Sequence, residues 1–110
     1  MPTVFRMITA TDVGTTPIDV LQIAEGVRAT VIGCNVSNTT TYDTVNVNVY
    51  VVDENSTAAT FVKNVIIPPN TAVKLITGGE KLILPETAGL RVESSIDNSV
   101  DAVVSYVEIS

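Results

Sequence analysis

Apolar and polar residues alternate along most of this chain, and the alternation is clearest between residues 44 and 53. Every second residue from Val45 to Val51 is a valine, while asparagine and tyrosine occupy the positions between them. A period of two puts alternate side chains on opposite faces of an extended strand. This segment is therefore predicted to be a β-strand with one buried, valine-lined face.

Similar short segments rich in β-branched residues recur along the sequence, separated by residues that favour turns. β-branched side chains fit a pleated sheet better than a helix. The spacing of the turn residues predicts about nine strands and no substantial helix. We expect these strands at residues 3–10, 18–23, 28–38, 44–53, 59–67, 71–76, 80–84, 89–95 and 100–109.

Four of these segments carry more detailed predictions. The strand at 28–38 should present one face made of Thr30, Ile32, Cys34 and Val36. In the strand at 59–67, the same alternation places Phe61, Val65 and Ile67 on one face. The strands at 71–76 and 80–84 are expected to pair as a hairpin around Gly78-Gly79, because glycine adopts the positive φ angles of tight turns.

The strand at 100–109 is apolar on both faces. One face holds Val103, Val107 and Ile109, and the other holds Val100, Ala102, Val104 and Tyr106. Such a strand is either central between two covered surfaces or in contact with another subunit. We therefore predict a subunit interface that joins the second face to apolar residues near the start of the sequence: Val4, Phe5, Met7, Val100, Ala102, Val104 and Tyr106.

Residues 1–10 have two interpretations. Val4, Phe5 and Met7 are split by Arg6, and the following loop, DVGTTP, has the Gly and Pro expected of a hinge. The segment is therefore either an N-terminal arm that reaches a neighbouring subunit or an edge strand of its own sandwich. Burial of Phe5 by such an arm would contribute about 1.5–3 kcal/mol.

Many short strands with turn signals at regular intervals predict an all-β protein. The expected class is an antiparallel β-sandwich, with either a jelly-roll or an immunoglobulin-like strand order. A chain of 110 residues suits one domain, so residues 1–110 are expected to form a single sandwich.

Charge and composition narrow the classes of partner. The chain has 12 acidic and 6 basic residues, a net charge of −6, and its basic residues are dispersed. Nucleic-acid binding needs clustered Lys or Arg, and anionic membranes attract the same clusters, so neither partner is expected. No apolar run approaches the ~18 residues of a spanning helix. The first residues lack the basic and apolar regions of a signal peptide, which predicts assembly in a cytoplasm.

Groups for catalysis or metal binding are scarce. Histidine is absent, which removes the commonest general base and transition-metal ligand. Cys34, the one cysteine, is expected to be a small buried hydrophobe rather than a reactive thiol. The carboxylates of Asp53-Glu54, Asp97 and Asp101 lack the spacing of a calcium loop and are better explained as charged turn residues. The sequence therefore predicts no enzyme, no metal site and no cofactor.

A series of short sequence segments, spread along nearly the whole chain, resembles a family of small virion proteins of tailed bacteriophages. The segments are DVGTTP at 12–17, VIGCNVSNTT at 31–40, VNVNVYVVD at 45–53, VKNVIIPPN at 62–70, GGEKLILPETAGLRVESS at 78–95 and VSYVEI at 104–109. The chain departs from the family at Ala88-Gly89, where Gly-Asp is usual. The resemblance implies a sandwich that acts as a capsid decoration (cement) protein and has no catalytic residues.

The resemblance also implies a location and partners. The protein would lie in the virion and contact the major capsid protein or other virion subunits, as a homo-oligomer, with a trimer favoured for a decoration protein. Two alternatives stay open: a neck, collar or tail-associated subunit, and a carbohydrate-binding or adhesion module. The absence of tryptophan and the small number of tyrosines favour packing on a shell over ring stacking on sugars.

Overall fold

The computed structural model describes residues 3–76 and 81–109, and all regular structure in these ranges is β-strand. This confirms the all-β prediction. Within residues 3–76 and 81–109 there is no helix long and apolar enough to cross a membrane. The strands are β1 (Thr3–Val13), β2 (Ile18–Gln22), β3 (Arg28–Asn38), β4 (Val45–Val52), β5 (Ala58–Ile67), β6 (Ala72–Ile76), β7 (Leu82–Leu84), β8 (Gly89–Ser94) and β9 (Val100–Ile109).

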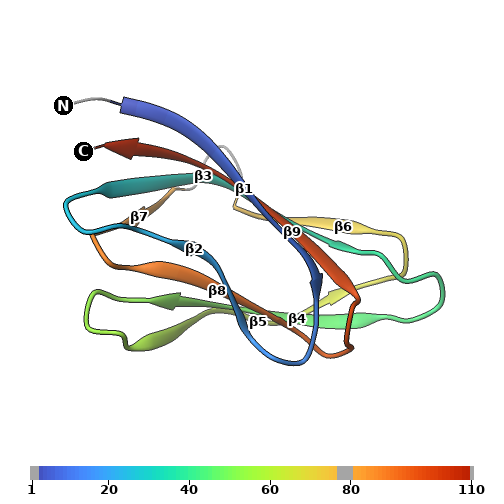
Figure 1. Cartoon of the computed structure of the whole chain (residues 1–110). Helices are drawn as coiled ribbons and strands as arrows, with labels where there is room; N and C mark the ends of the chain where they lie inside the picture. The colour runs from blue at the N-terminus through green and yellow to red at the C-terminus, as the bar shows by residue number, and fades with distance from the viewer. Residues whose placement is uncertain (1–2, 77–80, 110) are drawn as a thin grey trace.

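The strands form two antiparallel sheets that lie face to face (Figure 1). Sheet A has the order β1-β9-β3, and both β6 and β7 pair with the remaining side of β3. Sheet B has the order β2-β8-β4-β5. When β6 and β7 are counted as one interrupted strand, this is the order of the eight-stranded jelly roll. The immunoglobulin-like order is therefore excluded.

The predicted hairpin between β6 and β7 is wrong. β6 pairs with Cys34–Ser37 of β3, and β7 pairs with Ala29–Val31 of the same strand. Both run antiparallel to β3, so they point in the same direction and follow one another along its edge. Gly78-Gly79, on which the prediction rested, lies outside the described residues.

Aliphatic side chains fill the space between the sheets. The valines of β4 lie as predicted: Val45, Val47 and Val49 are at most 1% exposed. Burial of one such side chain contributes about 1.5–3 kcal/mol. The predicted face of β5 also packs on the core, through Phe61, Val65 and Ile67.

A β-bulge in β3 changes the face that was predicted for this strand. Val31 points into the core before the bulge and Cys34 after it, and the register with β9 shifts between Val31 and Gly33. One extra residue reverses the side to which the following residues point. The prediction that Thr30 and Ile32 share a face with Cys34 is therefore wrong.

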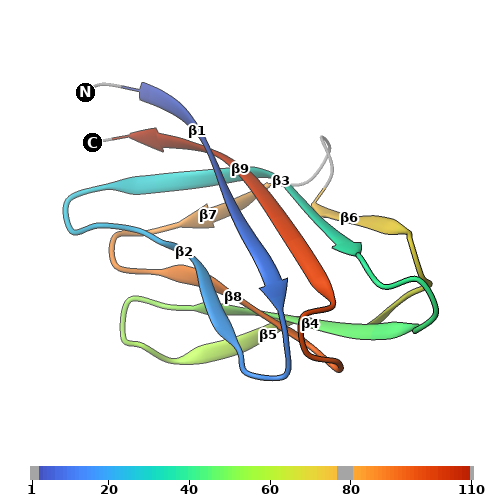
Figure 2. The same ribbon diagram turned by 45° about the vertical axis from the view of Figure 1, so that its right-hand side comes forward.

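β1 is an edge strand of sheet A and pairs with β9 (Figure 2). The register is unbroken from Thr3, which lies opposite Ile109, to Ala10, and it shifts only before Val13. Of the two interpretations of the first residues, the structure places residues 3–10 in the chain's own sheet. The start of β1 consequently lies beside the end of β9.

Asn38 is a buried polar residue at the end of β3, and only 2% of it is exposed. Its amide donates to the carbonyl oxygens of Asp43, at 2.7 Å, and Ile67, at 2.9 Å. Its Oδ1 accepts from the backbone N–H and the hydroxyl of Thr40, at 2.9 and 2.7 Å. These four bonds fasten the loop between β3 and β4 to the end of β5, since buried polar groups need partners.

Candidate interaction surface

The face of sheet A that points away from sheet B carries a row of three apolar side chains and one threonine. The strand registers place four residues in this row: Phe5 of β1, Val107 of β9, Thr30 of β3 and Ile83 of β7. Directly opposite residues of an antiparallel pair lie on the same face. Tyr106, the neighbour of Val107, points into the core, so the row lies on the outside. Phe5 is 76% exposed and Ile83 is 71% exposed.

Three more rows lie on this side of the sheet. They are Thr3, Ile109 and Arg28; Met7, Ser105 and Gly33; and Thr9, Val103, Asn35 and Lys74. Met7 is 66% exposed. We call the four rows together the outer face of sheet A. Its middle is largely apolar and its two charges are the cations Arg28 and Lys74. The next row on the same side, Asp101 with Ser37 and Ala72, carries a carboxylate at the border of this face.

A hollow opens in the outer face at the bulge of β3. Its volume is about 380 Å³, and it is lined by Ile32, Gly33, Cys34, Asn35, Lys74, Ile76, Val103 and Ser105. Gly33 leaves this space open because it has no side chain to cover Ser105. A Cβ at position 33 would approach the Cβ of Ser105 only to 3.9 Å, an ordinary contact. The outer face is therefore indented, with room for a side chain of a partner.

Three of the predicted interface residues lie on the exposed surface of β1. Phe5 and Met7 belong to the outer face of sheet A. Val4 lies opposite Glu108, on the other side of the strand, and is 38% exposed. The structure thus brings Phe5 and Met7 together with residues that the sequence analysis did not select.

The four predicted interface residues of β9 are buried inside the chain itself. Val100, Ala102 and Val104 are 0% exposed and Tyr106 is 7% exposed. The prediction is wrong for these residues, because sheet B covers the face on which they lie. Val103, Val107 and Ile109 are the apolar residues of β9 that face outward.

The sequence did contain a signal for the outward side of β9. Asp101 and Ser105 alternate in step with Val103 and Val107, and a polar residue marks the solvent side of a strand. Ile83 had a weaker signal, since it lies between two leucines that point to the core side. Ile83 lies on the outer face because β7 pairs with β3. The predicted hairpin paired this segment with residues 71–76 instead, so the position of Ile83 was not identified.

The outer side of sheet B is polar by comparison. The Glu93 carboxylate accepts hydrogen bonds from the amide of Asn48, at 2.9 Å, and the hydroxyl of Tyr50, at 2.7 Å. The bonds from Asn48 and Tyr50 lower the pKa of Glu93, and the bond to Glu93 raises the pKa of Tyr50. Ile66, which lies opposite Asn46, is an isolated apolar residue on this side and is 65% exposed.

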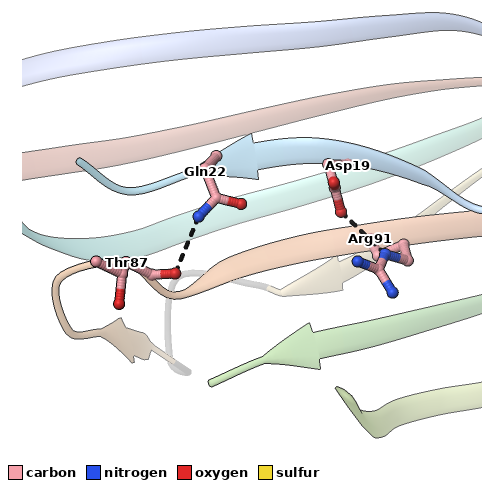
Figure 3. Close-up of polar contacts among 4 residues, drawn as sticks. All are labelled: Asp19, Gln22, Thr87 and Arg91. Atoms are coloured by element: carbon pink, nitrogen blue, oxygen red, sulfur yellow. Dashed lines mark hydrogen bonds and ion pairs between the residues drawn. The ribbon is translucent and has the colours of Figure 1, made fainter. Parts of the chain in front are cut away.

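Polar contacts also fasten β2, an edge strand of sheet B (Figure 3). The Arg91 guanidinium of β8 donates to the Asp19 carboxylate at 2.9 Å. The Gln22 amide donates to the carbonyl oxygen of Thr87 at 2.9 Å. This edge is therefore charged and tied to its neighbours.

The carboxylates considered for metal binding accept hydrogen bonds within loops. Asp53 accepts from the backbone N–H groups of Asn55 and Thr57, both at 2.9 Å. Asp97 accepts from the backbone N–H and the hydroxyl of Thr15, and these two bonds lower its pKa. Residues 3–76 and 81–109 contain no group of three or more acidic or cysteine side chains placed to hold a metal ion.

Cys34 is one of the residues that line the hollow, belongs to the core cluster and is 3% exposed. Burial raises the pKa of its thiol to about 11. The thiolate is the reactive form of cysteine, so this residue is inert at neutral pH. The prediction of a buried hydrophobe is confirmed.

Comparison with known proteins shows the fold but no family. No protein-family model and no curated protein matches the chain. The chain is similar to one from the disulfide-linked pili that are Bacillus endospore appendages, with a TM-score of 0.56 and 6% identity over 98% of this chain and 88% of that chain. It is also similar to a chain of infectious bursal disease virus, Gx strain, with a TM-score of 0.51 and 13% identity. The match covers 97% of this chain and 31% of the viral chain.

Proposed function

We propose that this protein is a non-enzymatic structural subunit of a phage virion, and specifically a capsid decoration (cement) protein that binds the shell through the outer face of sheet A. The observation that carries the proposal is the row from Phe5 to Ile83, whose two ends are 76% and 71% exposed. Large apolar side chains gathered on one exposed face mark sites of protein interaction. The partner is the major capsid protein or another virion subunit.

The charges of the outer face suit a protein partner. Few charged groups would lose water on binding, so the cost of desolvating the face is small. Arg28 and Lys74 lie outside the apolar middle, where they can meet carboxylates at the rim of a partner. The hollow at Gly33 gives an otherwise shallow, pleated surface a concave site that a side chain of the partner can fill.

The fold is compatible with an assembled structure, since pili and a virus supply the similar solved chains. Jelly rolls also occur in lectins, so the fold alone does not separate a shell subunit from a sugar-binding module. Sugar binding uses aromatic rings gathered around a site. The most exposed aromatic residues are Phe5, near the start of β1, and Tyr42, in the loop after β3. They lie in different parts of the chain, which favours the structural role.

Co-sedimentation with empty shells, assembled from the major capsid protein of the same genome, tests the proposal. Phe5→Ser and Ile83→Ser should each weaken binding roughly 10- to 100-fold, because each loses about 1.5–3 kcal/mol of apolar burial. Ile66→Ser is the matched control, since Ile66 is equally apolar and 65% exposed but lies on sheet B. Its binding should equal that of the wild type, and all three variants should keep the wild-type Tm.

Two outcomes would change the conclusion. Equal binding of the Phe5→Ser, Ile83→Ser and Ile66→Ser variants would show that the outer face of sheet A is not the attachment surface. Binding to purified tails or necks, with none to shells, would replace the decoration role by the neck, collar or tail-associated role.

A further inference from the structure

Over Thr3–Ala10, before the bulge that precedes Val13, β1 is a long and regular sheet edge with few of the features that protect such edges. Edge strands usually avoid unwanted pairing by being short, bulged or charged. β2 has 5 residues and the ion pair of Asp19 with Arg91, while β6 has 5 residues and β7 has 3. β5 has irregular pairing and carries Lys63. β1 has 11 residues, contains no lysine or proline, and pairs regularly with β9 from Thr3 to Ala10.

This edge is also close to neutral in an acidic protein. The segment Thr3–Ala10 contains no carboxylate, and its one charged residue is Arg6. The Arg6 Nε lies 3.0 Å from a carboxylate oxygen of Glu108 on β9. Two copies that each carry a net charge of −6 therefore meet little local repulsion if they approach along β1.

We propose that β1 pairs with β1 of a second copy, antiparallel across a two-fold axis that passes beside Met7, so that two copies of sheet A become one continuous sheet. Directly opposite residues share a face. A two-fold axis perpendicular to the sheet must therefore pass beside a residue that lies opposite its own copy. This condition reduces the possible registers to a few.

Charge selects among these registers. The regular segment Thr3–Ala10 is centred between Arg6 and Met7. An axis at Arg6 would place two arginines opposite each other, and like charges in that position are destabilising. An axis at Met7 places Arg6 opposite Ile8 of the second copy and Phe5 opposite Thr9. The Met7 register keeps nearly the whole regular segment paired and opposes no like charges.

The pairing concerns the edge of sheet A and stands independently of what its outer face binds. It would bring the outer faces of two copies side by side and double the area offered to a partner. Such a contact uses the same patch on both copies and closes as a dimer. The basic unit is then a dimer, in place of the trimer that the family resemblance favours.

Cysteine cross-linking of the full chain tests the register. Met7→Cys puts two thiols directly opposite, about 4.5–5.5 Å apart at Cβ, close to disulfide geometry. Thr9→Cys, on the same strand and face, separates the thiols by about 13 Å, since the rise is about 3.3 Å per residue. Mild oxidation should give a covalent dimer with Met7→Cys and none with Thr9→Cys. Cys34 does not interfere, because it is buried.

Hydrogen exchange of the wild type supplies a second measurement that needs no substitution. As concentration rises through the dimerisation range, alternate amides of Thr3–Ala10, those not bonded to β9, should become protected. Equal cross-linking at positions 7 and 9 would overturn the register. Edge amides that exchange rapidly at every concentration, or a monomeric mass throughout, would overturn the pairing itself. None of these outcomes depends on shell binding, so the two proposals can fail separately.

Discussion

Asn38→Asp should destabilise the protein strongly although it hardly changes the size of the side chain. The amide of Asn38 donates to the carbonyl oxygens of Asp43 and Ile67, at 2.7 and 2.9 Å. A carboxylate has no proton to donate and would face both oxygens in a site that is 2% exposed. An uncompensated buried charge costs about 3–5 kcal/mol, and we expect a loss of stability of this size at pH 7.

The loss should depend on pH, with a sign that follows from burial. Burial should raise the pKa of the introduced carboxyl above its unfolded value of about 3.9. Below a pH of about 3.9 the introduced carboxyl is protonated in both the folded and the unfolded state. The stability of the variant is then closest to that of the wild type, because the protonated carboxyl still donates one hydrogen bond. As the pH rises, the unfolded state ionises first, so stability falls by about 1.4 kcal/mol per pH unit until the folded pKa is reached.

Urea unfolding followed by circular dichroism, from acid to neutral pH, measures this difference from the wild type. Asn46→Asp is the matched control, because Asn46 is exposed on β4 and the same change of charge should cost little there. A deficit that does not vary with pH, or one below about 1 kcal/mol at neutral pH, would refute the reasoning about the buried amide.

Ile67→Ala should lower the free energy of unfolding by about 2–5 kcal/mol, since Ile67 is 0% exposed, while Ile66→Ala beside it should cost less than about 0.5 kcal/mol. Chemical unfolding curves measure both, and equal effects would contradict the assigned faces. The Cys34 thiol, whose pKa burial raises to about 11, should react with a thiol reagent slowly in the native protein and rapidly in urea; rapid native labelling would show that it is accessible. Tyr50→Phe should raise the lowered pKa of Glu93 toward 4.5, as followed by NMR titration of its carboxyl carbon. Because that pKa is lowered in the folded state, the stability that Glu93 contributes is complete above pH 4.5 and is lost as the pH falls; an unchanged titration in the variant would exclude the hydroxyl as a cause.

The fold class could be predicted because local pattern and burial agree in the most regular strands. The valines of β4 alternate in sequence and are buried in alternation. The bulge in β3 could not be predicted in the same way. Gly33 interrupts a run that is apolar enough to face the core in either register, so only the pairing with β9 shows where the alternation reverses.

Only part of the outer face of sheet A could be predicted, because local hydrophobicity does not show which face of a strand the other sheet covers. Phe5 and Met7 were selected as apolar residues on a weak strand, and the structure exposes both. β9 is apolar on both faces, so hydrophobicity alone could not tell which of them sheet B covers. Ile83 joined the surface through pairing with Thr30, a contact between residues far apart in sequence.

The position of β9 has a consequence for how the chain folds. β9 is the last described strand in sequence order, yet it lies between β1 and β3 in sheet A. Thr3 and Ile109 lie opposite each other although 106 positions separate them (109 − 3). Folds dominated by such distant contacts form slowly, in about milliseconds to seconds. At about 5–20 residues per second, a ribosome needs roughly 5–20 s between synthesis of β1 and synthesis of its partner. During that interval the segment that becomes β1 has no β9 to pair with, so Phe5 and Met7 stay accessible to chaperones and to other nascent copies.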